Sequence, residues 1–183
     1  MAVRAWCNNH TLRIDLRDTI RKPGPGWGSG DMTLVAEKIS PETRSRMMSG
    51  IKGKNTRPEI AVRSFLHRNG FRFRLHGSRL PGKPDVVLQR WNAVVFVHGC
   101  FWHGHSGCRY FKLPKTRTDL WKTKIDSNSQ RDALAIHRLR QAGWRVAIIW
   151  ECALRDEPDR ALDELLRFIR SEDISVEVTS LRR

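Results

Sequence analysis

The sequence predicts a layered α/β domain in which helices cover a β-sheet. A helical pattern with an apolar face occupies residues 56–68. Short runs rich in Val, Ile and Leu follow at residues 85–88, 93–97 and 145–150. Further helical patterns lie between and after these runs. Helices that precede and follow strands in this order are typical of a sheet packed between helical layers.

The first 31 residues differ in composition from the rest. They include the sequence Pro-Gly-Pro-Gly-Trp-Gly-Ser-Gly at 23–30 and show little apolar periodicity. This composition predicts a flexible N-terminal extension over residues 1–31. Residues 32–183 have the size of one domain with one core.

Two helix starts precede the first strands. Ser40 is a typical N-cap residue followed by proline, which predicts a helix through Met48. Thr56 and Glu59 have the spacing of a capping box, so a second helix is expected to begin there. An Asn-Gly pair at 69–70 ends this second helix.

A β-hairpin is expected from residues 85–88 and 93–97, with a break between them. A shorter strand is predicted at 71–75, before a Pro-Gly turn. Because paired strands bring the start of one beside the end of the other, the hairpin would place Asp85 close to His98.

The C-terminal half adds three elements. Residues 129–142 predict a helix that a glycine ends, and residues 145–150 predict a buried strand. The apolar stripe at 162–169 predicts a last helix.

The chain is strongly basic, with 34 Lys and Arg against 19 Asp and Glu and a formal net charge of +15. A polyanionic partner is expected, most simply nucleic acid, with a non-specific basic protein as the alternative. No apolar run approaches the roughly 20 residues of a membrane span, and no signal-peptide core is apparent. We therefore expect no membrane association and a cytoplasmic location.

Metal-ligand residues are concentrated in residues 98–108, which hold three histidines, two cysteines and two large aromatic residues. Zn²⁺ prefers tetrahedral thiolate and imidazole ligands. Cys100, His105, Cys108 and the distant Cys152 supply such a set. The alternative for Cys152 is a buried core cysteine, because it directly follows an apolar strand.

Three further residues suit phosphodiester hydrolysis, which needs a carboxylate-held divalent metal and groups that neutralise developing charge. Asp85 is the candidate carboxylate, although aspartate after proline is also a common turn residue. His98 and His103 remain once His105 is assigned to the zinc set.

Four segments in this order resemble the very short patch repair (Vsr) endonucleases. They are Pro84-Asp85, Val97–His103, Thr116–Trp121 and Gly143–Leu154. The similarity extends over roughly residues 38–170. It implies a restriction-endonuclease-like three-layer fold, with a central mixed β-sheet flanked by helices and a structural zinc site. It also implies an enzyme that nicks duplex DNA 5′ of the thymine in T:G mismatches from 5-methylcytosine deamination, initiating very short patch repair.

The resemblance implies roles for the candidate site residues. Asp85 and the main chain at Val97 would bind a catalytic Mg²⁺, and His98 and His103 would lie beside the scissile phosphate, with His103 transferring a proton. Glu59 matches an acidic helix residue near this site, and the capping box remains an equal alternative. The Cys₃His set matches the structural zinc ligands.

Aromatic and basic residues suit DNA binding. Side chains inserted between bases can read and bend a disturbed duplex. The resemblance assigns this wedge to Phe101, Trp102 and Trp121, with Met48 opposing them. A core position on a helix is the alternative for Trp121. The flanking basic residues predicted to track phosphates are Lys112, Lys115 and Arg117.

Two positions depart from the family pattern. Val97 replaces a threonine, so only its carbonyl remains as a ligand. His105 and Cys108 lie one residue further apart than in the family, which predicts a slightly rearranged zinc loop.

Two other functions stay open: a zinc-containing DNA-binding protein without catalysis, and a nuclease acting on other damaged or unmismatched DNA. For the leading function we expect a monomer at the bacterial nucleoid. Its partners would be T:G-mismatched DNA, mismatch-repair factors and a cognate cytosine methyltransferase.

Overall fold

The computed structural model describes residues 40, 42–43 and 53–181. The chain divides into two units, Met1–Pro41 and Glu42–Arg183, and the description below concerns the described residues of the second. The predicted extension, its boundary at residue 32 and Met48 lie outside the described residues. Glu42 and Thr43 are helical, within the helix predicted from Ser40.

A five-stranded mixed sheet forms the centre of the fold. Its strands, in spatial order, are β1 (Arg74–Leu75), β2 (Val86–Leu88), β3 (Ala93–His98), β4 (Arg145–Trp150) and β5 (Ser175–Val178). β1, β2 and β3 pair antiparallel, whereas β3, β4 and β5 pair parallel. The predicted hairpin is confirmed, with Val87 opposite Val94. A 3₁₀ turn, Gln89–Trp91, joins its two strands.

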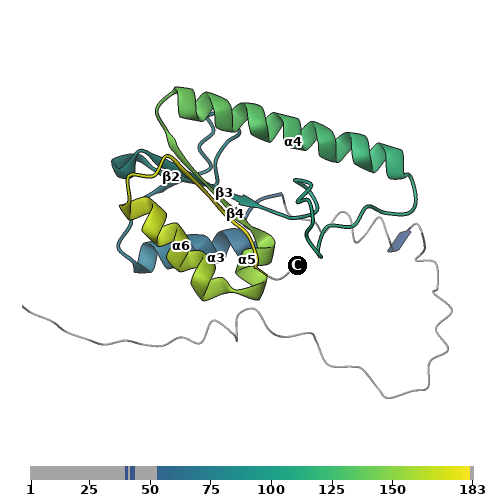
Figure 1. Ribbon diagram of the computed structural model, residues 1–183, viewed down its shortest axis with the longest axis horizontal. Coiled ribbons are helices and arrows are strands. Elements are labelled where there is room, and N and C mark those ends of the chain that lie inside the picture. Colours follow the sequence, from purple (N-terminus) through teal and green to yellow (C-terminus); the bar gives the residue numbers. More distant parts are fainter. Residues whose placement is uncertain (1–39, 41, 44–52, 182–183) are drawn as a thin grey trace, which may run out of the picture. The chain divides into compact units, whose positions relative to one another are not determined.

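Helices cover both faces of the sheet, which gives the three layers predicted. They are α3 (Arg57–Arg68), α4 (Thr118–Gln141), α5 (Glu151–Asp156) and α6 (Pro158–Arg170). Figure 1 shows α4 alone on one face, with α3, α5 and α6 on the other.

Side-chain alternation along the strands divides the core between the two faces. Val95 belongs to the larger cluster, where Leu66 of α3 and Leu165 of α6 pack. Its neighbour Val94 belongs to the smaller cluster, with Leu139 of α4. The alternating apolar residues thus fix which face each helix covers.

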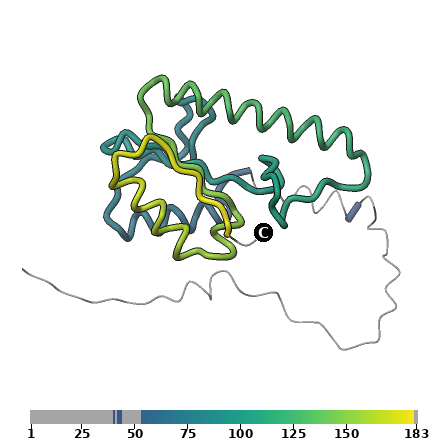
Figure 2. The backbone as a smooth tube through the Cα atoms, in the orientation of Figure 1, coloured from purple at the N-terminus to yellow at the C-terminus, as the bar shows by residue number. Residues whose placement is uncertain are grey.

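Helix α4 begins at Thr118, eleven residues before the predicted start at 129, so that prediction was wrong. Apart from Leu120 and the half-buried Trp121, its first turns are polar and exposed, and Ile125 is the buried residue in this half. A weak apolar pattern therefore concealed the helix. Figure 2 shows this half running past the end of β3, beside the loop that follows β3.

Two short elements were not predicted, α5 and β5. Neither is long enough to show its own periodicity, and both depend on packing against β4 and α6. The strand predicted at 71–75 is reduced to Arg74–Leu75. Among the described residues, no helix combines the length and apolarity needed to cross a membrane.

Candidate active site

A cavity of about 720 Å³ opens where the parallel strands β3 and β4 end. Segments far apart in the sequence contribute to its wall, from α3 to the start of α5. The residues with predicted roles that line it are Glu59, Asp85, Val97, His98, Trp102 and His103. The structure therefore brings together the residues that the sequence selected for phosphodiester chemistry.

Asp85 is fixed at the start of the hairpin by the neighbouring strand. Its backbone N–H donates to the carbonyl of Val95 at 3.1 Å, and its Oδ2 accepts from the N–H of Val97 at 2.8 Å. Burial raises the pKa of the Asp85 carboxyl, and the charge of Glu59 raises it further. A carboxylate in this position is stabilised by a bound cation, which fits a metal ligand.

Glu59 caps α3 and also lines the cavity. The hydroxyl of Thr56 accepts from the Glu59 N–H at 3.4 Å and donates to Glu59 Oε1 at 2.9 Å. Glu59 Oε2 accepts from the N–H of Asn55 at 3.0 Å and from Arg63 at 2.6 Å. The predicted capping interaction is therefore present, and the carboxylate is buried beside Asp85.

His98 and His103 stack at one wall of the cavity. Their ring centroids lie 3.9 Å apart and the ring planes differ by 4°. Burial lowers the pKa of His98 to about 3, and the charge of His103 contributes to this shift. His98 is thus a neutral imidazole at physiological pH.

His103 has a carboxylate partner that the sequence did not reveal. Its Nδ1 lies 2.6 Å from Oδ2 of Asp132 on α4. Because an ionised carboxylate only accepts hydrogen bonds, Nδ1 carries the hydrogen and Nε2 is left to exchange a proton. Asp132 lies 29 positions from its partner, on a polar helix face, so no local pattern indicated it.

Glu151 also lines the cavity, at the first position of α5. It follows Trp150, which pairs in register with His98 across β3 and β4. That register places it beside the histidines. The sequence alone did not indicate Glu151 as a cavity residue. Its position beside the histidines follows from the parallel pairing of β3 with β4.

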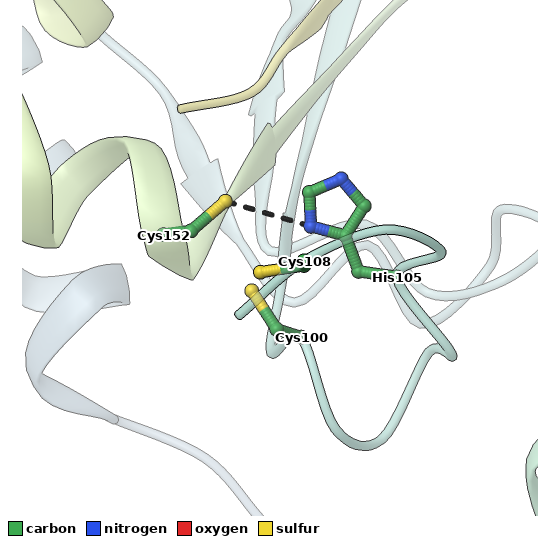
Figure 3. A group of neighbouring side chains, drawn as sticks. All are labelled: Cys100, His105, Cys108 and Cys152. Atoms are coloured by element: carbon green, nitrogen blue, oxygen red, sulfur yellow. Dashed lines mark hydrogen bonds between the residues drawn. The ribbon is translucent and has the colours of Figure 1, made fainter. Parts of the chain in front are cut away.

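Three cysteines and a histidine form a second cluster, shown in Figure 3. One donor atom from each of Cys100, His105, Cys108 and Cys152 lies within 4.8 Å of the others. Cys152 Sγ and His105 Nδ1 are 3.5 Å apart, and Cys152 extends from α5 toward the loop that carries the other three. The predicted four-residue set is therefore assembled.

The chemistry of this cluster fits a bound metal cation. Burial raises the pKa of the Cys100 and Cys152 thiols, so thiolates there need a positive partner. Burial also lowers the pKa of His105, which favours the neutral imidazole that binds metals. The ring of His105 stacks on Trp150, with centroids 4.0 Å apart.

The three predicted wedge aromatics lie together at one side of the cavity, which Trp102 lines. Trp121, on the first turns of α4, lies 5.4 Å from Phe101 and 6.0 Å from Trp102 between ring centroids. All three are half-buried, and Trp121 belongs to neither core cluster of the sheet. Lys124 Nζ lies 5.6 Å and 5.7 Å from the two tryptophan rings. The predicted phosphate-contacting residues Lys112, Lys115 and Arg117 are exposed.

Sequence comparison places these features in a known family. The family described as DNA mismatch endonuclease Vsr matches residues 36–109. The type II nicking enzyme V.XorIIP of Xanthomonas oryzae pv. oryzae is 52% identical over 122 residues, 67% of this chain and 89% of the relative. The DNA mismatch endonuclease Vsr of Escherichia coli K12 is 44% identical over 148 residues, 79% of this chain and 94% of the relative.

The chain belongs to the Vsr family. The type II nicking enzyme V.NmeAIP of Neisseria meningitidis is a further relative, 43% identical over 129 residues, 69% of this chain and 91% of its own. Membership confirms the predicted resemblance and, with the mixed sheet, the restriction-endonuclease-like fold class. The Vsr match includes the cavity residues Glu59, Asp85, His98 and His103.

Proposed function

We propose that this Vsr-family protein is a Mg²⁺-dependent, strand-specific endonuclease. It would nick duplex DNA 5′ of the thymine in T:G mismatches from 5-methylcytosine deamination and so initiate very short patch repair. The observation that supports this proposal best is one cavity that unites Asp85, His98 and the His103–Asp132 pair, beside a half-buried aromatic cluster. A DNA-binding module without catalysis has no need of that combination.

Mg²⁺ binds hard oxygen ligands, and two such groups are proposed here. The carboxylate of Asp85 and the main-chain carbonyl of Val97 would hold the ion. When bound, Mg²⁺ polarises a phosphoryl oxygen and helps to generate the attacking hydroxide. Among the described residues, the one side-chain hydrogen bond of Asp85 is accepted from the Val97 N–H by Oδ2, so the other carboxylate oxygen would bind this ion.

The two histidines would divide the remaining work. His103, oriented by Asp132 through Nδ1, would transfer a proton at Nε2. His98 is neutral and buried, so it would offer a hydrogen bond to the phosphate without bringing charge. Glu59 would act beside Asp85 mainly by capping α3 and by adding a negative charge next to the Asp85 carboxylate.

Mismatch recognition is assigned to the aromatic cluster of Phe101, Trp102 and Trp121. Inserting such rings costs least where base pairing is already disturbed. Lys112, Lys115 and Arg117, in the loop before α4, and Lys124 would contact phosphates nearby. Met48, outside the described residues, stays a predicted opposing group.

A structural Zn²⁺ in the Cys₃His cluster would brace the loop that carries both functions. The cluster ties residues 100–108 to Cys152, and His103, Phe101 and Trp102 lie on that loop, in contact with Trp121 of α4. The ion would therefore fix the phosphate-facing histidine relative to the mismatch-reading rings.

The proposal extends to the surroundings of the enzyme. We expect a monomer acting in the bacterial cytoplasm at the nucleoid. A cytosine methyltransferase would generate the substrates of deamination, and mismatch-repair factors would share the lesion.

The deciding test is a nicking assay on duplexes that differ only in one base pair, T:G, T:A or C:G. We expect nicking at T:G that requires Mg²⁺, and at least 100-fold loss in Asp85→Asn, which keeps the side-chain volume. Equal cutting of all three duplexes would contradict mismatch specificity and would indicate a nuclease that acts on another DNA substrate. Full activity of Asp85→Asn would contradict the assigned metal ligand.

A further inference from the structure

The turn before β2 places one lysine at the cavity. Lys83 lies two residues before Asp85 and lines the same space. We infer that the Lys83 ammonium group contacts a non-bridging oxygen of the scissile phosphate and stabilises the charge that develops there during hydrolysis. The inference rests on the proposed phosphodiester hydrolysis, and Lys83 transfers no proton in it.

Charge balance in the cavity supports this role. Four of the described lining residues are acidic: Glu59, Asp85, Asp132 and Glu151. Lys83 is the single lysine or arginine among the described lining residues. A phosphodiester is itself an anion, so it enters an acidic cavity only where cations offset the repulsion. A bound metal ion would supply one such charge, and Lys83 supplies another at the wall of the same cavity.

Glu59 and Glu151 already have cationic partners, whereas Lys83 has no ion-pair partner among the described residues. Arg63 pairs with Glu59 at 2.6 Å, and Arg155 pairs with Glu151 at 3.3 Å. Within the described part of the chain, Lys83 forms no ion pair, and it is exposed. Its charge is therefore available to an incoming anion.

The backbone holds Lys83 in place. The N–H of Lys83 donates to the carbonyl of Leu80 at 3.1 Å, closing a turn. Gly82 has φ +69 and packs so closely that an added Cβ would lie 2.8 Å from Cβ of Ala135 on α4. Lys83 itself has φ 51, a conformation that L side chains rarely adopt. An asparagine or glycine suits this conformation better, so the lysine side chain is not explained by backbone preference.

The test compares Lys83→Met and Lys83→Asn with Arg79→Met. Arg79 is an exposed residue of the same connection and does not line the cavity. Asparagine suits the left-handed backbone at position 83, so the second variant keeps the fold while removing the charge. Thermal unfolding checks that all three variants are folded.

Single-turnover nicking rates and duplex dissociation constants are measured separately. We expect both Lys83 variants to nick on the order of 100-fold more slowly, with less than about a threefold change in the dissociation constant. Arg79→Met keeps the wild-type rate, and Lys83→Arg recovers at least tenfold over Lys83→Met. A wild-type rate in folded Lys83→Asn would overturn the inference. All variants are compared on a duplex that the wild type nicks. The role of Lys83 is therefore tested even if the wild type does not prefer T:G mismatches.

Discussion

The imidazole rings of His98 and His103 lie face to face, 3.9 Å apart, yet their surroundings differ. His98 is buried and held neutral, whereas His103 is bonded to the carboxylate of Asp132. Two identical side chains in contact thus have different surroundings: burial lowers the pKa of His98, and a carboxylate hydrogen bond orients the ring of His103. This asymmetry suits one group that accepts or donates a proton and one that only forms hydrogen bonds.

Asp132 should act as a positioning residue for His103. In Asp132→Asn the amide can donate to Nδ1, which stabilises the wrong tautomer, so we expect single-turnover nicking to fall by on the order of 100-fold or more. Duplex binding should change little, and the pH–rate profile should shift. Asp126→Asn, an exposed aspartate of the same helix, is the control. Equal pH profiles for Asp132→Asn and wild type would refute this role.

Burial of His98 makes stability depend on pH. The pKa of His98 falls from 6.5 to about 3 on folding, so below pH 6.5 the unfolded chain takes up a proton that the folded chain refuses. The stability that comes from burying neutral His98 is fully present above pH 6.5 and is lost as the pH falls toward 3. At pH 5 the loss is about 2 kcal/mol relative to pH 7.

Urea unfolding of wild type and His98→Gln at pH 7 and pH 5 measures this loss. Glutamine does not titrate, so the wild type should lose about 2 kcal/mol more than the variant over this range. Titration of the Cys₃His cluster changes the stability of wild type and of His98→Gln equally, so it cancels when the two losses are subtracted. Identical losses would show that His98 is not buried in the neutral form.

Local sequence patterns predicted the sheet centre and most of the site. Two short apolar runs separated by a break predicted the hairpin of β2 and β3, and its pairing brings Asp85 to Val97, next to His98. Donor chemistry alone selected the Cys₃His cluster. The structure brings these residues together as expected, because each inference depended on neighbouring residues or on residue type.

The missed residues depend on contacts between distant segments. Asp132 reaches His103 only because a polar half-helix that lacks an apolar stripe lies over the loop after β3. Glu151 reaches the cavity through the parallel pairing of β3 with β4. Lys83 appeared as an ordinary turn residue. In each case the sequence gives the side chain but not the long-range packing that decides its neighbours.

Trp121 should affect recognition more than folding. It is half-buried in the aromatic cluster and outside both core clusters, so Trp121→Ala should leave the Tm almost unchanged. Binding to a T:G duplex should weaken by about tenfold or more, the usual value of one base-stacking contact. Leu134→Ala, at a 49% exposed position of the same helix, is the control. A large fall in Tm with normal binding would instead identify Trp121 as a structural aromatic.

Removal of one metal ligand should unfold the loop and release the metal. Wild type is expected to contain one zinc per chain, and Cys152→Ser to contain none. Because metal binding is coupled to folding, the Tm of the variant should fall by on the order of 10 °C. Cys7→Ser, at the one cysteine of the sequence outside the proposed ligand set, should keep both zinc and Tm. Zinc retained at full occupancy in Cys152→Ser would contradict the four-ligand assignment.

Gly82 should be required for the close packing of the active-site turn against α4. In Gly82→Ala the new Cβ meets Cβ of Ala135 at 2.8 Å and the ring of Phe96 at 3.2 Å, in a backbone conformation with φ +69. We expect a loss of about 2 kcal/mol or more in the free energy of unfolding, together with slower nicking as Lys83 and Asp85 move.

Adding Ala135→Gly to Gly82→Ala removes the closest contact but not the backbone strain. The double variant should therefore recover part of the loss relative to the sum of the two single variants, because two residues in contact do not act additively. Strict additivity in urea unfolding would show that the turn does not pack against α4 at this point.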